Sequence, residues 1–233
     1  MKHAVAAGKH HTEVSIGADA ATLRGTLALP TGAAGIVLFS HGSGSGRLSP
    51  RNIYVAERLY RAECATLLFD LLTAEEEERD ALTAEFRFDI PLLTRRLVAV
   101  TRWTRAQPAL HDLKIGYFGA STGAAAALIA AARVPGIAAV VSRGGRPDLA
   151  GAALVDVPAP TLLIVGGNDD EVLTLNRQAL AQLRCEARLA IVPEATHLFE
   201  EPGALEQVAS LAAAWFTRHF GPPLPAEGLP QKP

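Results

Sequence analysis

The sequence predicts an α/β protein with a mostly parallel, doubly wound sheet, helices on both faces and an antiparallel hairpin at the N-terminus. Short apolar runs recur along the chain, and most are continuous rather than alternating, which is typical of strands covered on both faces. Stretches with helical spacing lie between these runs, joined by short loops. Because right-handed crossovers connect parallel strands, this alternation places helices on both sides of the sheet.

The individual elements follow from residue patterns. Residues 12–17 and 22–29 alternate apolar and polar positions around Ala18-Asp19, which predicts the hairpin. The predicted parallel strands are the runs 35–40, 65–70, 114–119, 137–142, 161–166 and 188–193. The predicted helices are 50–63, 86–106, 122–133, 171–183 and 203–219. Ligands bind beyond the carboxyl ends of such strands, so we expect the functional residues in the loops that follow the apolar runs.

Length and composition indicate one globular domain. The chain has 233 residues, of which 49% are hydrophobic and 20% charged, and its formal net charge is -2. We expect residues 1–220 to form a single α/β domain and the Pro-rich residues 221–233 to be a disordered tail. A chain so close to neutral is not expected to bind nucleic acid.

The composition also predicts a cytoplasmic protein without a membrane partner. The N-terminal apolar run has only about five residues, too few for a secretory signal, and no segment reaches the ~20 apolar residues of a membrane span. The two cysteines, Cys64 and Cys185, have neither the number nor the spacing of a disulfide framework or a zinc site.

An acidic run, Glu75 to Glu78 followed by Arg79 and Asp80, is the one candidate for a metal site. Consecutive carboxylates on one helix point in different directions, so they cannot converge on one ion. Acidic side chains are also favoured at the positive N-terminal end of a helix dipole. We interpret the run as the solvated start of a helix and expect no metal.

The strongest functional motif is Gly119-Ala120-Ser121-Thr122-Gly123, which matches G-x-S-x-G. It lies between a predicted strand and an Ala-rich predicted helix, so Ser121 occupies the sharp turn between them. Glycine on both sides supplies the space that closely approaching backbones need. This context is typical of the nucleophile elbow in the α/β-hydrolase fold. The alternative is a tight turn whose serine only caps the helix.

A serine nucleophile requires a base, and in this fold the acid and the histidine follow the serine in the chain. Only His197 and His219 come after Ser121. His219 ends an apolar helical pattern, where a surface histidine facing the helix dipole is expected. His197 follows the last predicted strand, at the edge where ligands bind, and is the predicted base.

The predicted acid is Asp169, in the loop after the strand 161–166. Asp169 is the first acidic residue beyond the turn, whereas Asp170 and Glu171 resemble the start of the next helix. The sequence nevertheless leaves Asp170 as an alternative acid. The acid accepts a hydrogen bond from the imidazole and stabilises the imidazolium that forms during the reaction.

An acyl-transfer reaction also needs hydrogen-bond donors for the oxyanion. The backbone N–H of Thr122, at the N-terminal end of the helix, is one predicted donor, and the N–H of Ser43 is the other. Ser43 lies in the glycine-rich loop His41 to Arg47, where glycines let amides approach a ligand closely. This loop lacks the spacing and the Lys-Ser/Thr ending of nucleotide-binding motifs, so we expect no nucleotide. His41 precedes Ser121 and is expected to hold the loop.

These segments together resemble the dienelactone hydrolase family of α/β-hydrolases. The resemblance rests on HGSGSGRLSPRN, LLFDLLTAEEEE, FRFDI, GYFGASTG, VVSRGGRPDL, TLLIVGGND and THLFEEPGAL in this order. It implies a single-domain, cofactor-free hydrolase without a large lid, whose nucleophile, acid and base correspond to Ser121, Asp169 and His197. The family typically carries cysteine as the nucleophile, and this chain carries serine. That difference favours a simple carboxylic ester over dienelactone as the substrate.

Three arginines are candidates for binding a substrate carboxylate through their forked geometry. Arg143 and Arg146 follow a sheet strand on the active edge, and Arg87 is a weaker candidate; structural arginines that tie loops together are the alternative.

The expected activity is hydrolysis of small or aryl carboxylic esters, and also lactones, by a monomer or homodimer whose partner is the small-molecule ester. An acyltransferase or a thioesterase with the same triad is one alternative. A non-catalytic binding module with the same fold is another, because a fold by itself does not define a function.

Overall fold

The structure is a computed structural model that describes residues 11–222 of the chain. Within them, one sheet contains β1 (His11–Ala18), β2 (Ala21–Ala28), β3 (Gly35–Ser40), β4 (Ala65–Phe69), β5 (Lys114–Ala120), β6 (Ile137–Arg143), β7 (Thr161–Gly166) and β8 (Ala187–Val192). The helices are α1 (Pro50–Arg61), α2 (Ala74–Thr83), α3 (Ile90–Ala106), α4 (Thr122–Arg133), α5 (Asp170–Gln182) and α6 (Ala204–Phe220), with a 3-10 segment η1 (Pro147–Asp156). All but Gly221 and Pro222 of the predicted tail lie outside the described residues.

The sheet has the strand order β1-β2-β4-β3-β5-β6-β7-β8. β1 pairs with β2 and β2 with β4 in antiparallel register, whereas β3 to β8 run parallel to one another. The predicted hairpin and the predicted parallel sheet are therefore both confirmed. From β3 the chain moves first to β4 on one side and then to β5 on the other. The loops after β3 and β5 consequently diverge, as at the ligand-binding crevice of doubly wound sheets.

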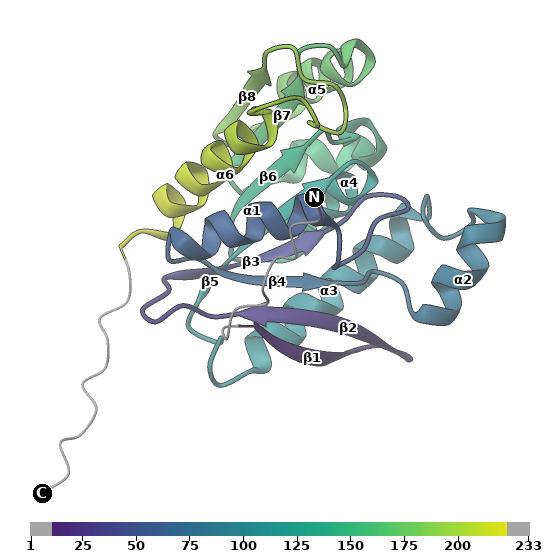
Figure 1. The fold of residues 1–233 in the computed structure, drawn as a ribbon, viewed down its shortest axis with the longest axis vertical. Coiled ribbons are helices and arrows are strands. Elements are labelled where there is room, and N and C mark those ends of the chain that lie inside the picture. The colour runs from purple at the N-terminus through teal and green to yellow at the C-terminus, as the bar shows by residue number, and fades with distance from the viewer. Residues whose placement is uncertain (1–10, 223–233) are drawn as a thin grey trace, which may run out of the picture.

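Helices cover both faces of the sheet (Figure 1). α1 and α6 lie on one face, where Val55 and Phe216 pack with Phe39 of the sheet in one buried cluster. α3, α4 and α5 lie on the opposite face, where Leu128 packs with Leu38 in a second cluster. α2 projects beyond the carboxyl end of β4 (Figure 1). None of the helices between residues 11 and 222 combines the length and the apolar composition needed to span a lipid bilayer.

Two segments differ from the sequence prediction. α3 begins at Ile90 rather than at residue 86, because Asp89 accepts a 2.9 Å hydrogen bond from the Leu92 N–H and caps the helix there. η1 has no counterpart among the predicted helices. The backbone leaves helical geometry at Gly151, whose φ is 53°. The two short pieces on either side do not give a continuous helical periodicity in the sequence.

Two glycines let α4 begin directly against the sheet. A Cβ on Gly119 would lie 2.4 Å from the Cα of Ala124, and a Cβ on Gly123 would lie 2.2 Å from the carbonyl oxygen of Ser40. Both distances are far shorter than the ~3.5 Å at which such atoms come into favourable contact. The close junction of β5 and α4 therefore depends on glycine at both positions.

We predict that Gly123→Ala lowers the free energy of unfolding by about 3 kcal/mol or more, because the added methyl group meets backbone oxygens rather than a flexible side chain. Urea unfolding followed by circular dichroism measures the change. Gly17→Ala is the matched control, since a Cβ on Gly17 meets nothing within 4 Å. Equal stability of the two variants would contradict the role assigned to Gly123.

Candidate active site

Ser121 occupies a strained turn between β5 and α4. Its φ is 49° and its ψ is -122°, a region of backbone conformation that non-glycine residues rarely adopt. The Ser121 N–H donates to the carbonyl oxygen of Arg143 at 3.3 Å, and the Ser121 carbonyl accepts from the N–H groups of Ala124 and Arg146 at 3.1 Å each. The turn is thus held by hydrogen bonds to the next strand and its loop, and its side chain is partly exposed.

The Asp169 and His197 side chains meet at the same edge of the sheet. His197 Nδ1 and Asp169 Oδ2 lie 2.7 Å apart, with side-chain exposures of 38% for the histidine and 14% for the aspartate. Asp169 is the N-cap residue of α5 but makes no side-chain capping bond, so its carboxylate is free to accept from the imidazole. Asp170, the alternative acid, is the first residue of α5.

Backbone hydrogen bonds join the loops that carry this pair. The Gly167 N–H donates to the Val192 carbonyl at 2.8 Å, and the Asn168 N–H donates to the Ala195 carbonyl at 2.9 Å. Within the histidine loop, Glu201 Oε1 accepts from both the N–H and the hydroxyl of Thr196, at 3.0 and 2.6 Å. This role of Glu201 could not be predicted from the sequence, because a carboxylate that binds within its own loop leaves no distinct pattern.

The loop after β6 brings the serine and the histidine to one corner. Arg143 accepts from the Ser121 amide, and a Cβ on the next residue, Gly144, would lie 3.5 Å from His197 Cε1. No hydrogen bond joins Ser121 Oγ to His197 among residues 11–222. Catalytic hydrogen bonds often tighten only when substrate is bound. The predicted acid and the predicted base are therefore in contact, and residues 143 and 144 connect the predicted nucleophile to the histidine.

The two predicted oxyanion residues are in direct contact. Ser43 Oγ and Thr122 Oγ1 lie 3.1 Å apart, and the Ser43 hydroxyl also donates to the Arg87 carbonyl at 3.4 Å. Neither the Ser43 nor the Thr122 amide donates to another backbone group in the part of the chain that the structure describes. Thr122 begins α4, so the positive end of the helix dipole also faces this point.

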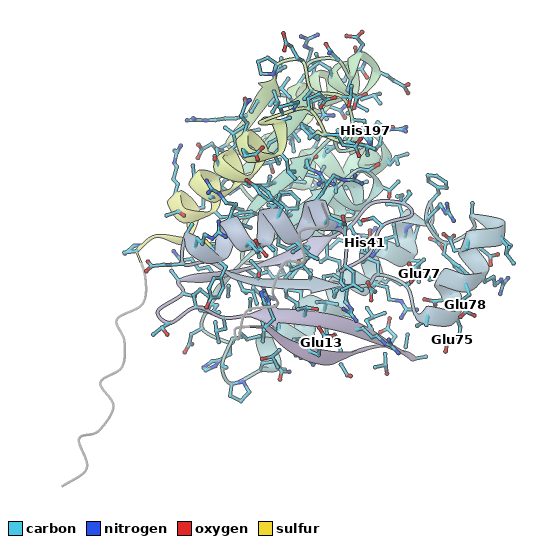
Figure 2. All side chains as sticks on the ribbon, viewed as in Figure 1. Glu13, His41, Glu75, Glu77, Glu78 and His197 are labelled. Carbon is cyan, nitrogen blue, oxygen red and sulfur yellow. The ribbon has the colours of Figure 1, made fainter. Side chains whose placement is uncertain are left out.

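His41 connects the loop after β3 to the end of β4. Its Nε2 accepts from the Leu71 N–H at 2.9 Å, and its Nδ1 lies 3.0 Å from the Gly42 carbonyl. An amide can only donate and a carbonyl can only accept, so these partners fix the neutral tautomer with the proton on Nδ1. Burial lowers the pKa of His41, which favours the same neutral form. Both ring nitrogens are occupied by loop contacts. Figure 2 shows His41 and His197 toward the carboxyl edge of the sheet.

The three candidate arginines have different environments. Arg146 forms a two-pronged ion pair with Asp148, at 2.9 and 2.8 Å. Arg87 Nε donates to Asp80 Oδ2 at 2.6 Å. Arg143 is only 9% exposed and has no carboxylate partner among the described residues. The guanidinium groups of Arg87 and Arg146 are thus neutralised within the protein, and that of Arg143 is not.

Asp80 is buried, with 4% of its surface exposed, so the acidic run 75–80 is not solvated throughout as the sequence indicated. Its Oδ1 accepts from the amides of Phe86 and Arg87, at 2.7 and 2.9 Å. Burial by itself raises the pKa of Asp80, but these hydrogen bonds and the Arg87 guanidinium outweigh it and hold the pKa below its ordinary value. The start of α2 is a capping box between Thr73 and Glu76.

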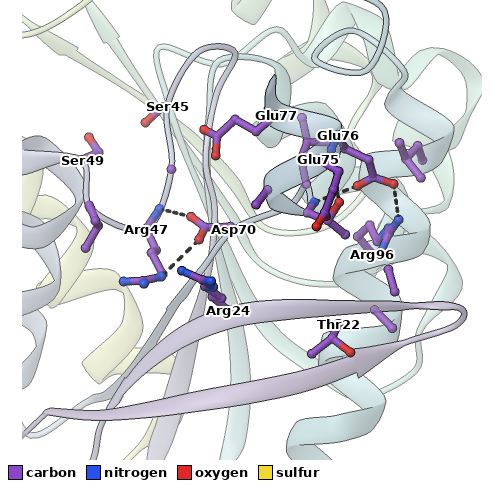
Figure 3. Close-up of a pocket in the computed structure, with 18 of the residues that line it drawn as sticks. Thr22, Arg24, Ser45, Arg47, Ser49, Asp70, Glu75, Glu76, Glu77 and Arg96 are labelled. Carbon is purple, nitrogen blue, oxygen red and sulfur yellow. Dashed lines mark hydrogen bonds and ion pairs between the residues drawn. The ribbon is translucent and has the colours of Figure 1, made fainter. Parts of the chain in front are cut away.

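Two adjoining cavities lie beside the predicted oxyanion residues. The smaller, of about 230 Å³, is lined by residues that include Ser43, Thr122 and Leu93. The larger, of about 1250 Å³, reaches from the loop 43–51 to the β1–β2 hairpin, with the Arg47–Asp70 and Arg96–Glu76 ion pairs on opposite sides (Figure 3). The loop 43–45 and the side chain of Glu77 line both cavities. Burial, followed by the charges of Asp70 and Asp80, raises the pKa of Glu77.

No cluster of three or more potential metal ligands occurs in residues 11–222. The sheet order, the serine elbow between β5 and α4, and the acid and histidine after β7 and β8 define an α/β-hydrolase fold. The sequence profile of the dienelactone hydrolase family matches residues 23–220, and the chain belongs to that family.

Solved structures agree with this assignment. A dienelactone hydrolase from Anabaena variabilis is 58% identical, with a TM-score of 0.89, and the match covers 90% of this chain and 97% of that chain. An esterase from Pyrococcus furiosus superposes with a TM-score of 0.73 at 18% identity, over 91% of this chain and 93% of that chain. At that identity the likeness shows the fold alone.

Two longer relatives come from Mycobacterium tuberculosis, strains CDC 1551 / Oshkosh and H37Rv, and both are named as candidate phosphoribosyl transferases. Each is 57% identical over 216 residues, which is 92% of this chain and 48% of the relative. The chain thus spans about half the length of these relatives.

The depressed pKa of Asp80 predicts acid sensitivity. A carboxylate of this kind contributes stability that is fully present above its unfolded pKa, about 3.9, and is lost as the pH falls through the lower folded pKa. We therefore expect the wild type to lose more stability between pH 5 and pH 2 than Asp80→Asn does, as measured by urea unfolding at each pH.

At pH 7 we expect Asp80→Asn to lower the free energy of unfolding by about 3 kcal/mol, because Arg87 is left without its buried partner. Asp112→Asn, at a side chain 78% exposed, is the control and should stay within about 0.5 kcal/mol of the wild type. Parallel pH profiles for Asp80→Asn and the wild type would rule out this account.

Proposed function

We propose that this chain is a serine hydrolase that cleaves carboxylic esters through an acyl-enzyme on Ser121. The observation that supports the proposal is the arrangement of Ser121, His197 and Asp169 at the carboxyl edge of the sheet. Ser121, with a φ of 49°, is hydrogen-bonded to Arg143, and the next residue, Gly144, lies against His197, whose Nδ1 is 2.7 Å from Asp169 Oδ2. Membership of a hydrolase family supports the assignment.

In the proposed reaction Ser121 Oγ attacks the ester carbonyl while His197 Nε2 takes the hydroxyl proton. The bond from His197 Nδ1–H to Asp169 leaves Nε2 unprotonated and stabilises the imidazolium once it forms. His197 then returns the proton to the leaving alcohol. A water molecule, deprotonated by the same nitrogen, attacks the acyl group and releases the acid and the free serine.

The amides of Ser43 and Thr122 are the proposed donors to the oxyanion. The contact between their hydroxyl groups keeps the two loops together, and both amides are free of other backbone acceptors in the described residues. Donors fixed in this way stabilise charge that develops in the transition state without reorganisation. The Asp80–Arg87 ion pair supports this arrangement, because the Arg87 carbonyl accepts from the Ser43 hydroxyl.

The cavity beside these amides favours a short acyl group. Its volume of about 230 Å³ is below the roughly 300–1,000 Å³ typical of pockets for drug-sized ligands. Small or aryl esters and small lactones have acyl groups that a cavity of this volume can hold. Because serine, unlike cysteine, depends on its base throughout acylation, activated esters are the most suitable first substrates.

We predict that Ser121→Ala lowers kcat/KM for an activated aryl ester such as 4-nitrophenyl acetate by at least about 10⁴-fold, since removal of the nucleophile leaves only binding and the oxyanion donors. Release of 4-nitrophenol gives the rate, and thermal unfolding verifies the fold. Ser210→Ala, at an exposed position of α6, is the control. A Ser121→Ala enzyme that keeps its activity would refute the proposed mechanism.

Asp169→Asn should lower kcat by about 10³- to 10⁴-fold, because the amide no longer fixes the imidazole tautomer or stabilises its charge. Steady-state kinetics at pH 7 measure the loss. The same measurement on Asp170→Asn separates the two candidate acids, since Asp170 lies in the first turn of α5. A larger loss in Asp170→Asn would transfer the role to that residue.

The same triad would serve an acyltransferase or a thioesterase. The His197 side chain is 38% exposed, so water can reach the base, which favours hydrolysis. We expect the free acid to remain the main product when methanol or a small thiol is added at millimolar concentration, as measured by chromatography of the products. Predominant transfer to the added acceptor would establish an acyltransferase instead.

A further inference from the structure

A third cavity, the α3 cavity, has a volume of about 470 Å³ and lies along α3, on the face of the sheet that also carries α4. Its lining comes from the β1–β2 turn, from α3 and from the C-terminal end of α4. Arg133, one of its lining residues, ends α4, whereas Ser121 precedes the first residue of that helix. About 18 Å of helix therefore separates the two. The α3 cavity is thus a different place from the proposed catalytic site.

Positive charge dominates the α3 cavity. Four arginines line it, and they share the lining with one carboxylate: Arg95, Arg102, Arg105, Arg133 and Asp19. Neither α3 nor α4 contains an aspartate or a glutamate, so the two helices supply no counterion of their own. The chain as a whole has a formal net charge of -2. The positive surplus is therefore a local property of this cavity.

The charges of these arginines are not neutralised within residues 11–222. All four side chains are exposed, and none forms an ion pair with a carboxylate in that part of the chain. Arg96 provides the contrast, because it is buried and pairs with Glu76 at 2.7 Å. Arg105 Nη2 donates to the Pro135 carbonyl at 2.6 Å, which fixes the side chain but leaves its charge in place.

Three of the arginines follow one face of α3. Arg95, Arg102 and Arg105 have helical spacing, and the row they form is about 15 Å long. Like charges at this spacing repel one another, and a bound anion would relieve the repulsion. The helix dipole favours cations in the last turn, where Arg105 and Arg133 lie. It gives no reason for Arg95 and Arg102, which lie further from that end.

The part of the cavity near the end of α4 is the most positive. Asp19 and Arg95 also line the larger cavity beside the hairpin, so they mark the other end of the α3 cavity. The remaining arginines, Arg102, Arg105 and Arg133, have no carboxylate beside them among the lining residues. Guanidinium groups bind phosphate through paired N–H donors, and three of them together suit more than one phosphate group.

We propose that the α3 cavity binds a small anion that carries two or more phosphate groups. A single phosphate would leave part of the arginine row unpaired. The volume lies within the roughly 300–1,000 Å³ typical of small-ligand pockets, and a nucleoside polyphosphate or an inorganic polyphosphate has the required charge. A nucleic acid needs a positive surface that extends well past one cavity, whereas this chain is negative overall. The site goes beyond the proposed ester hydrolysis and does not depend on it.

Calorimetry with ATP, inorganic triphosphate and AMP tests the proposal. EDTA is included, so that no divalent cation covers the phosphates. We expect ATP or triphosphate to bind with a Kd below about 1 mM, as two or more hydrogen bonds between charged groups would give, and the tighter of the two identifies the source of the phosphates. AMP should bind at least about 10-fold more weakly. A Kd above about 1 mM for both polyphosphates, or equally tight binding of AMP, overturns the proposal.

Arg102→Gln and Arg133→Gln should each raise the Kd of the tighter ligand by about 10- to 100-fold or abolish measurable binding, because each removes a charged donor. Both side chains are exposed, and thermal unfolding verifies that the variants fold. Arg177→Gln is the matched control, since it removes the same charge from an exposed position of α5 outside the cavity and should leave the Kd unchanged. An unaltered Kd in both Arg102→Gln and Arg133→Gln contradicts the proposed site.

Asp19→Asn tests the sign of the effect. Asparagine tolerates the φ of 53° at this turn, so the change removes the charge and keeps the backbone. The Kd should fall by about two- to five-fold, the size of an interaction between exposed charges. A Kd that rises instead would show that the ligand is not held by positive charge.

Two further measurements separate this proposal from its rivals. A single-stranded DNA of about 20 nucleotides should bind more weakly than the tighter polyphosphate; tighter binding that is lost in Arg102→Gln would replace the small ligand by nucleic acid. Hydrolysis of 4-nitrophenyl acetate should be equal in Arg102→Gln and the wild type. Polyphosphate binding without any esterase activity leaves the α3 site standing and removes the hydrolase proposal, and esterase activity without polyphosphate binding does the reverse.

Discussion

The backbone conformation of Ser121 is the constraint on which the rest of the site depends. A non-glycine residue at a φ of 49° is strained by an amount on the order of 1–3 kcal/mol, so the surroundings must hold it in place. Gly119 and Gly123 provide the space, and the hydrogen bonds to Arg143 and Arg146 fix the two ends of the turn. The turn leaves Ser121 partly exposed, as its proposed role as nucleophile requires.

The fold could be predicted from the sequence because its cause is local. A strand such as 161–166 is covered on both faces, so it is apolar at every position, and the prediction matches the observed Thr161–Gly166. The glycines around Ser121 mark the turn for the same reason, since backbone geometry there depends on which side chains are small. Chain order in the fold then limited the histidine to His197 or His219.

The pairings of charged side chains depend on how the loops fold and do not follow from a repeating sequence pattern. Asp80 is embedded in an acidic run that resembles a solvated helix start, yet the fold buries it against the amides of the segment 86–87. The charge state of the arginines is equally hidden, because Arg146 is neutralised two residues away while Arg143 has no partner in the described part of the chain. A sequence gives the charges, and the tertiary structure alone gives their distances.

The hydrogen bonds between the loops after β7 and β8 have a consequence for how the site can vary. Because Gly167 donates to the end of β8 and Asn168 to the histidine loop, the segments that carry Asp169 and His197 are held together by backbone hydrogen bonds. The serine belongs to a separate segment, the β5–α4 elbow, and the loop through Gly144 sets the spacing between them. In this arrangement, the main distance that can vary is the one between the Ser121 hydroxyl and the His197 imidazole. If Ser121 is the nucleophile as proposed, replacing its oxygen by the larger sulfur of cysteine requires an adjustment of this loop only and leaves the contact between Asp169 and His197 intact.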